Sequence, residues 1–168
     1  MKNFKNLKIT QNKKGIVRII LNDPANYNSL SLDMIKSLLA TLKSLNKNQK
    51  SKVIIIEGAG KGFSAGHNLK EIKSMKKKSS YQTLFNKCSE LMLCIVNHRK
   101  PIIAKVHGAA FAAGCQLVAS CDLAYSSSNA IFATPGVNIG LFCSTPMVAL
   151  SRKVNHKKSI KMLLTGKP

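Results

Sequence analysis

The segment that decides the fold runs from residue 100 to residue 117 and reads Lys-Pro-Ile-Ile-Ala-Lys-Val-His-Gly-Ala-Ala-Phe-Ala-Ala-Gly-Cys-Gln-Leu. Pro101 ends a preceding helix, and the next five residues have the length and β-branched content of a buried strand. Gly108 follows that strand, and residues 112–121 are small and apolar, which predicts a buried helix. A strand that leads through a glycine turn into a helix is the repeating unit of α/β proteins.

The same alternation extends in both directions from this segment. Residues 53–56, Val-Ile-Ile-Ile, form an apolar run that is typical of a strand covered on both faces. Leucines at helical spacing follow Ser31, a predicted helix N-cap, and Thr145 is a second predicted N-cap. Strands and helices therefore alternate, and we expect an α/β fold with parallel strands in one domain over residues 1–168. The other predicted elements are a hairpin (5–10 and 15–21), helices (81–96 and 157–165) and short strands (123–126 and 131–133).

The charge of the chain is strongly positive, with 27 Lys and Arg against 6 Asp and Glu. Only three of the basic residues are Arg, Trp is absent and aromatic residues make up 5% of the chain. Nucleic-acid surfaces favour Arg and stacking aromatic rings, so a nucleic-acid partner is the weaker interpretation. We expect neither a membrane span nor a metal site, because no apolar run is long enough and the five cysteines are irregularly spaced.

Two glycine-containing segments follow predicted strands, at residues 63–69 and at residues 107–115. Small residues at such points let the backbone approach a ligand closely. A helix that begins near residue 113 offers amide N–H groups that have no partner within the helix. Two such donors aimed at one oxygen form an oxyanion hole.

Several motifs in order resemble the enoyl-CoA hydratase/isomerase, or crotonase, family. They are Asn-Asp-Pro (22–24), Asn-Ser-Leu (28–30), Gly-Phe-Ser-Ala-Gly-His-Asn-Leu-Lys-Glu (62–71), the segment 100–117 and Cys-Asp-Leu-Ala (121–124). Residues 132–146 are most similar to one branch of this family. The resemblance covers nearly the whole chain and implies a crotonase-like spiral of ββα units with a mostly parallel central sheet.

The resemblance also implies a ligand, a coenzyme A thioester, with no separate cofactor. In such proteins two backbone N–H groups bind the thioester carbonyl oxygen, and by motif position these belong to His67 and Ala113. The nucleotide side of the ligand is implied to lie against four residues of the first segment, namely Ala65, Asn68, Leu69 and Lys70.

Both carboxylates that a family hydratase uses on water are missing. The position of the first glutamate is occupied by Gln116, and that of the second by Gly136. A neutral amide can hold a water molecule but cannot accept its proton. His67 and His107 are the possible substitutes, and Cys143 or Ser144 are weaker candidates for a reactive group. The residues thus leave open an acyl-CoA-binding enzyme of fatty-acid metabolism and a non-catalytic acyl-CoA-binding relative, with a basic nucleic-acid-binding protein less favoured.

The last four residues resemble a Thr-Gly segment of the family that further C-terminal helices follow. We therefore expect a truncated chain, a trimer only for a full-length form, and an exposed apolar face where such helices would pack. The cysteine content and the lack of an apolar leader favour the cytoplasm, with the mitochondrial matrix as the alternative.

Overall fold

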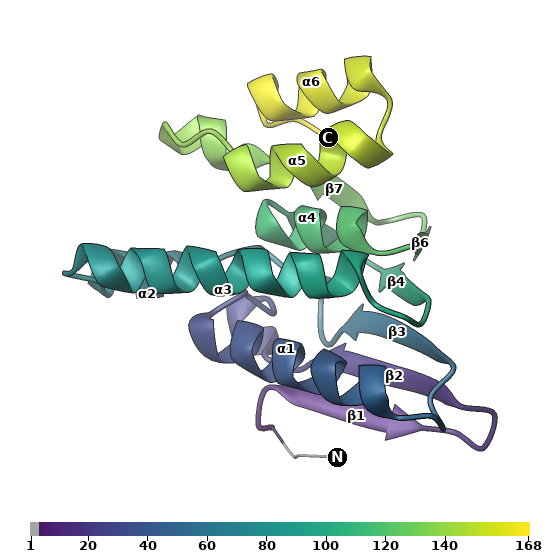
Figure 1. The fold of residues 1–168 in the computed structure, drawn as a ribbon. Helices are drawn as coiled ribbons and strands as arrows, with labels where there is room; N and C mark the ends of the chain where they lie inside the picture. Colours follow the sequence, from purple (N-terminus) through teal and green to yellow (C-terminus); the bar gives the residue numbers. More distant parts are fainter. Residues whose placement is uncertain (1–3) are drawn as a thin grey trace.

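A five-stranded sheet forms the centre of the computed structural model, which describes residues 4–168. Its strand order is β1-β2-β3-β4-β6 (Figure 1). The strands are β1 (Leu7–Gln11), β2 (Ile16–Leu21), β3 (Val53–Gly58), β4 (Ile102–Val106) and β6 (Leu123–Ser126). β1 and β2 are an antiparallel hairpin, and every other neighbouring pair is parallel. The predicted α/β class with a mostly parallel sheet is therefore confirmed.

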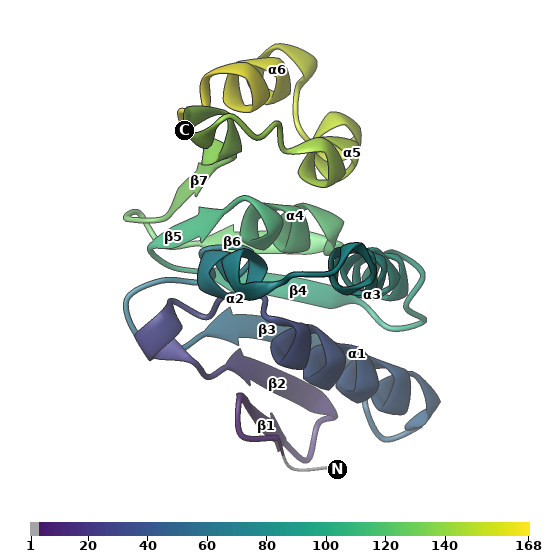
Figure 2. The same cartoon turned by 90° about the vertical axis from the view of Figure 1, so that its left-hand side faces the viewer.

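The second half of the chain repeats one pattern twice. A strand of the large sheet is followed by a strand of a small two-stranded sheet and then by helix, as in β4, β5 (Ala109–Phe111) and α4 (Ala113–Ser120). The next turn uses β6, β7 (Ile131–Ala133) and the 3-10 helix η2 (Pro135–Ile139) before α5 (Ser144–Lys153) and α6 (His156–Thr165). Figure 2 shows these turns stacked on one another, which is the expected spiral of ββα units.

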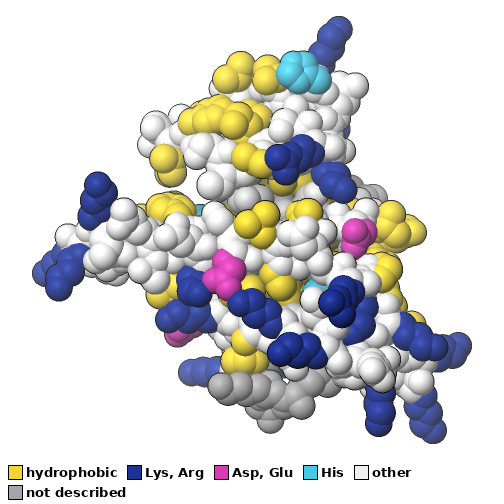
Figure 3. Space-filling model, viewed as in Figure 1, with side chains coloured by type: hydrophobic (Ala, Val, Ile, Leu, Met, Phe, Trp, Pro, Cys, Tyr) yellow, Lys and Arg dark blue, Asp and Glu magenta, His cyan; other side chains and the backbone are white. Residues whose placement is uncertain are grey.

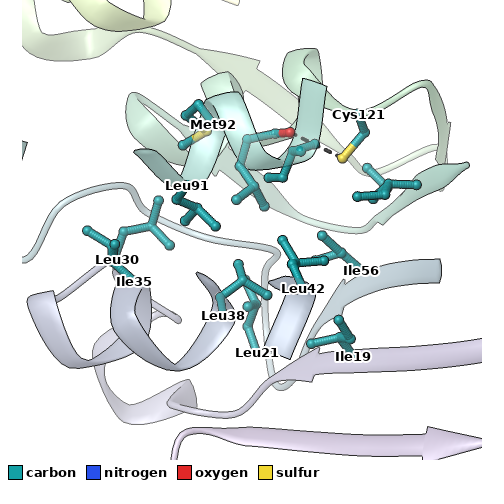
Figure 4. Packing of buried hydrophobic residues seen from close by; sticks show 14 of the residues in the cluster. Ile19, Leu21, Leu30, Ile35, Leu38, Leu42, Ile56, Leu91, Met92 and Cys121 are labelled. Atoms are coloured by element: carbon teal, nitrogen blue, oxygen red, sulfur yellow. Dashed lines mark hydrogen bonds between the residues drawn. The ribbon is translucent and has the colours of Figure 1, made fainter. Parts of the chain in front are cut away.

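The main core lies between the large sheet and two long helices, α1 (Leu32–Lys47) and α3 (Lys78–Val96). Figure 4 shows side chains of α1, such as Leu38 and Leu42, facing Ile19 and Ile56 of the sheet. Each fully buried side chain of this size contributes about 1.5–3 kcal/mol relative to its exposed state. The helical leucine spacing therefore fixes α1 on the sheet.

Only one face of the large sheet is covered by helices (Figures 1 and 2), so the prediction that residues 53–56 are buried on both sides is wrong. The open face carries Glu57, whose carboxylate lies 2.6 Å from Arg18 Nε and 3.4 Å from Lys105 Nζ. Charged side chains on three adjacent strands interrupt the apolar row on this face. At the sheet edge, Leu123 and Tyr125 are 52% and 65% exposed.

Local signals placed most helix ends correctly. The Ser31 side chain accepts a hydrogen bond from Met34 N at the start of α1, and Gly166 ends α6 in a left-handed conformation. The prediction for Thr145 is wrong, because α5 begins at Ser144 with Cys143 as its N-cap. Among the strands and α-helices, two have no counterpart in the sequence predictions, the short strand β5 and the helix α2 (Leu69–Ser74).

A second, smaller core lies among α4, α5 and α6 and contains Cys115, Leu150 and Met162. Around it, several large apolar side chains are exposed, and Figure 3 shows hydrophobic atoms gathered on this part of the molecule. They are Ile139, Leu141, Phe142, Met147, Val148, Ile160 and Leu164. The expected exposed apolar surface is therefore present on these elements. Among residues 4–168, no helix has both the length and the apolarity that a membrane crossing requires.

Candidate active site

Two strand-exit segments lie against each other and form the floor of the candidate site. The amides of Phe63 and Ser64 both donate to the Ala109 carbonyl oxygen at 3.0 Å, and Phe111 N donates to the Ser64 oxygen at 2.9 Å. The segments that the sequence singled out at residues 63–69 and 107–115 are therefore joined by backbone hydrogen bonds.

A third segment, between η1 (Pro24–Asn26) and α1, fastens to the first. Leu30 N donates to the Gly66 oxygen at 2.7 Å, and Ala65 N donates to the Tyr27 oxygen at 3.0 Å. The side-chain NH₂ group of the buried Asn28 donates to the carbonyl oxygens of Ala59 and Gly62. The motifs at residues 22–30, 62–71 and 100–117 thus meet at one place.

Two glycines make the close approach possible. A Cβ at Gly66 would lie 2.8 Å from the Phe111 oxygen and 3.1 Å from Ala113 N, and Gly66 has φ +86°. A Cβ at Gly114 would collide with the Ser64 carbonyl and lie 2.9 Å from the Ser64 Cβ. Larger residues at either position would separate the two segments.

Backbone strain is concentrated at the residue immediately before α4. Ala112 has φ 48° and ψ −118°, a conformation that L-residues rarely adopt. Such strain costs of order 1–3 kcal/mol and is found preferentially at ligand-binding sites. Here it turns the chain sharply into α4, so that Ala113 presents its N–H at the first position of a helix.

The amides of His67 and Ala113 are the donors that the sequence predicted for an oxyanion hole. Across residues 4–168, neither N–H has a hydrogen-bond acceptor. His67 follows Gly66, where an added Cβ would lie 3.1 Å from Ala113 N, so the two segments run close together at this point. Ala113 lies at the positive end of the α4 dipole. Two amides without acceptors at this junction can bind one anionic or carbonyl oxygen.

The His67 side chain is held in one orientation. Its Nδ1 lies 3.2 Å from the Leu30 carbonyl oxygen, and its ring packs edge-on against Phe85 of α3, with 5.3 Å between the centroids. Burial lowers the pKa of the imidazole below its ordinary value, although the bond to Leu30 opposes this shift. The ring is therefore neutral at pH 7.

Gln116 lies one turn into α4 and is 6% exposed. It lines a pocket of about 260 Å³ between α3, α4 and α5, together with apolar residues such as Met92 and Val148. Its Oε1 is buried and has no hydrogen-bond partner in the described part of the chain. The pocket therefore holds a neutral amide beside apolar side chains, and its lining also includes Arg152 and Lys153 but no carboxylate.

Gly136 is buried in η2, and the structure leaves no room for a side chain at this position. A Cβ there would collide with the Leu141 carbonyl oxygen and lie 2.8 Å from Cys143 Sγ. The Leu141 backbone and the Cys143 side chain thus fill the space that a glutamate at this position would need. Cys143 is itself buried in this packing.

The remaining predicted ligand contacts belong to the surface beside His67. Ala65, Leu69 and Lys70 are exposed. Asn68 has a structural role, because its Oδ1 accepts from Lys70 N and Glu71 N as the N-cap of α2. Three of the four residues therefore offer accessible surface next to the two amides.

His107 is separated from this arrangement. Its Nε2 lies 2.8 Å from the Gly60 carbonyl oxygen, and it lines a different pocket with Glu57 and Tyr125. Sequence reasoning missed the roles of Ala112, Leu30 and Phe85, since backbone strain and long-range contacts to His67 have no local signature. Across residues 4–168, no three His, Cys, Asp or Glu side chains gather as a metal site.

Comparison with protein families identifies the class to which this fold and site belong. The model of the enoyl-CoA hydratase/isomerase family matches residues 11–168. The chain therefore belongs to the enoyl-CoA hydratase/isomerase family, and the predicted crotonase-like fold is confirmed by the solved structures described next.

Within the family, the chain is similar to one group of relatives. It is 50% identical over 159 residues to enoyl-CoA hydratase domain-containing protein 3, mitochondrial, from Rattus norvegicus. The aligned region covers 95% of this chain and 53% of the relative. The Homo sapiens protein of the same name is 50% identical over 154 residues, 92% of this chain and 51% of the relative. The chain spans about half the length of the curated relatives it matches.

Two solved structures superpose closely. Human enoyl-coenzyme A hydratase domain-containing protein 3 has a TM-score of 0.92 at 47% identity, over 97% of this chain and 64% of that one. An enoyl-CoA hydratase from Mycobacterium smegmatis has a TM-score of 0.94 at 43% identity, over 98% of this chain and 64% of that one. The branch suggested by residues 132–146 is thus the one that these relatives represent.

Proposed function

We propose that this chain binds an acyl-CoA thioester and acts on it in fatty-acid metabolism. The thioester carbonyl oxygen would accept hydrogen bonds from His67 N–H and Ala113 N–H. The observation that carries this proposal is that two backbone amides, within residues 4–168, have no acceptor where two segments meet. The close approach of these segments requires Gly66 and Gly114, and Ala113 lies at the positive end of the α4 dipole. No further cofactor is needed for this binding.

The chemistry of a thioester explains why such donors are useful. Removal of a proton beside the carbonyl, or addition of water to a conjugated double bond, places negative charge on the carbonyl oxygen. Donors that are already fixed stabilise this charge most where it develops, in the transition state. The Ala112 strain supports this function, because it holds one donor in place before a ligand arrives.

The nucleotide half of the ligand would lie over Ala65, Leu69 and Lys70. These residues are exposed next to His67, and Lys70 carries a charge opposite to that of the CoA phosphates. The net charge of +21 also attracts an anionic ligand over a distance.

Hydration by the usual pair of glutamates is not part of this proposal. Gln116 offers an amide without a proton-accepting group, and the Leu141 backbone and the Cys143 side chain fill the place next to Gly136. These two features favour a second candidate, a non-catalytic acyl-CoA-binding protein. The two candidates share the ligand and differ in turnover.

The test is a comparison of butyryl-CoA, free CoA and ATP by isothermal titration calorimetry. Butyryl-CoA should bind more tightly than CoA, because only the thioester has the carbonyl oxygen, and ATP should bind most weakly. Equal affinity for all three ligands would refute the proposal. Loss of absorbance of crotonyl-CoA then separates the two candidates, since only an enzyme consumes it.

A pair of proline variants isolates one donor. Ala113→Pro removes the N–H at the first position of α4. His156→Pro does the same at the first position of α6, where His156 is exposed. Proline is tolerated at the first position of a helix. Ala113→Pro should remove the preference for butyryl-CoA over CoA, whereas His156→Pro should retain it.

The location and assembly of the protein follow the relatives in this proposal. The names of the similar rat and human proteins contain the word mitochondrial, which supports the mitochondrial matrix and gives the cytoplasm no support. A trimer is proposed only for a full-length form.

A further inference from the structure

The Leu30 carbonyl fixes the protonation pattern of His67. A carbonyl oxygen only accepts hydrogen bonds, so the ring nitrogen 3.2 Å away, Nδ1, must carry the proton. In a neutral imidazole the other nitrogen, Nε2, then holds a lone pair. The structure therefore presents His67 as a base with its accepting atom already defined.

No protein group uses that lone pair. His67 Nε2 is buried and has no hydrogen-bond partner among the described residues. A buried acceptor without a partner is energetically unfavourable, because it has lost its hydrogen bonds to water. Native structures keep few such groups, and they keep them preferentially where function requires them.

Covalent geometry keeps Nε2 within one side-chain length of the His67 backbone N–H. His67 N–H is one of the two proposed carbonyl donors, so the ring lies within one side-chain length of the thioester. Phe85 packs against the ring, and Ser89, one turn further along α3, lines the Gln116 pocket. His67 and Gln116 therefore lie along the same face of α3.

Other bases are absent from this place in residues 4–168. Glu71 is the acidic residue nearest in sequence, and its carboxylate accepts from Leu32 N at 3.1 Å and 3.3 Å. Burial raises the pKa of the Cys115 thiol in α4 to about 12, so it remains protonated. Of the other five acidic residues, Asp23 accepts from the Asn26 side chain and Asp122 accepts from Ile102 N. Glu57 and Glu90 form ion pairs, and Asp33 of α1 is exposed.

We propose that His67 Nε2 is the base that removes a proton from the carbon next to the thioester carbonyl. This inference rests on the proposed function, because the two amides must hold the carbonyl oxygen. The C–H bond breaks, an N–H bond forms at Nε2, and the electron pair moves through the new C=C bond onto the thioester oxygen. The reverse step returns the proton, so no other reactant is required.

The experiment measures exchange of the α-protons of butyryl-CoA in D₂O by proton NMR. This exchange requires only a base and stabilisation of the enolate, so it does not depend on which overall reaction the protein catalyses. The parent chain should exchange these protons well above the rate without protein. Loss of a general base lowers such rates by about 10²–10⁴-fold.

Two substitutions separate the base from the structural role of the ring. In His67→Asn the amide NH₂ can still donate to the Leu30 carbonyl, but the Nε2 atom is gone. We expect exchange to fall at least about 100-fold, while butyryl-CoA affinity stays within about threefold. The matched control is His107→Gln, which alters the histidine bound to Gly60 and should leave exchange unchanged.

The outcomes are distinct. Exchange by His67→Asn at the parent rate would overturn the inference, and so would binding of butyryl-CoA by the parent without exchange. Failure of butyryl-CoA to bind would overturn the proposed function and this inference with it. Nitrogen-15 NMR of the imidazole provides a second measurement, because protonation at Nε2 rather than Nδ1 would contradict the assigned tautomer.

Discussion

Gly114→Ala tests whether the contact between α4 and the 63–69 segment positions the two amides. On helix propensity alone, alanine is about 1 kcal/mol more favourable than glycine in a helix. In this structure the added methyl group would collide with the Ser64 carbonyl and lie 2.9 Å from the Ser64 Cβ. Inserting a methyl group into such a packed contact costs typically 1–3 kcal/mol.

The two terms together predict a net loss in the free energy of unfolding of about 0–2 kcal/mol. The Ser64 carbonyl cannot simply turn aside, because it accepts from Phe111 N at 2.9 Å. The start of α4 must therefore shift, and Ala113 N–H moves relative to His67 N–H. Loss of one hydrogen bond of about 1 kcal/mol corresponds to roughly a fivefold weaker affinity for the thioester.

The assay combines urea unfolding with calorimetric titration of butyryl-CoA and CoA. Gly114→Ala should reduce the affinity for butyryl-CoA and leave the affinity for CoA nearly unchanged. Gly140→Ala is the control, because Gly140 has φ +75° and a Cβ there meets no atom within 4 Å. It should lower stability by about 1–2 kcal/mol without changing the ratio of the two affinities. A Gly114→Ala chain that is about 1 kcal/mol more stable, with parental affinities, would refute this reasoning.

Three further predictions concern the same site. Ala112→Gly should raise the free energy of unfolding by about 1 kcal/mol, since glycine adopts φ 48° without strain, and urea unfolding that shows a loss would contradict this. Gly136→Glu should not create a hydratase and should lower stability by at least about 1–3 kcal/mol, because its side chain must displace the Leu141 backbone; a stable variant that hydrates crotonyl-CoA would show the opposite. Because burial lowers the pKa of His67, the unfolded chain takes up the proton first as the pH falls below about 6.5, so stability decreases there. Between pH 7.5 and 5.5 the parent should lose more stability than His67→Asn, and equal losses in urea unfolding would argue against this shift.

Local features of the sequence predicted much of the fold. The hairpin turn is closed by the Asn12 side chain, which accepts from Lys14 N and Ile16 N at 3.0 Å. Ser31 and Gly166 mark helix ends as expected. These interactions join residues that are close in the chain, so the residue type and its neighbours are sufficient to predict them.

Elements that depend on distant residues were harder to predict. The strand β5 has three residues and exists because it pairs with β7, about twenty residues later. The open face of the sheet was also missed, because an apolar run such as residues 53–56 does not reveal how many helices cover it. Phe85 lies in the helix α3, and the helical pattern alone does not reveal that it is 38% exposed and packs on His67.

The sequence by itself determined the order of strands and helices, the two glycine-containing segments and the absence of glutamate at positions 116 and 136. Only the tertiary structure decided that the chain segments at Gly66 and Gly114 approach their neighbours too closely for a side chain, and that Leu141 and Cys143 fill the space beside Gly136. The structure also decided that Leu30 binds one nitrogen of His67, while the other has no partner within residues 4–168. The physical reason is that a site of this kind is made from hydrogen bonds and close contacts between segments 30 to 50 residues apart, whose distances no local pattern records.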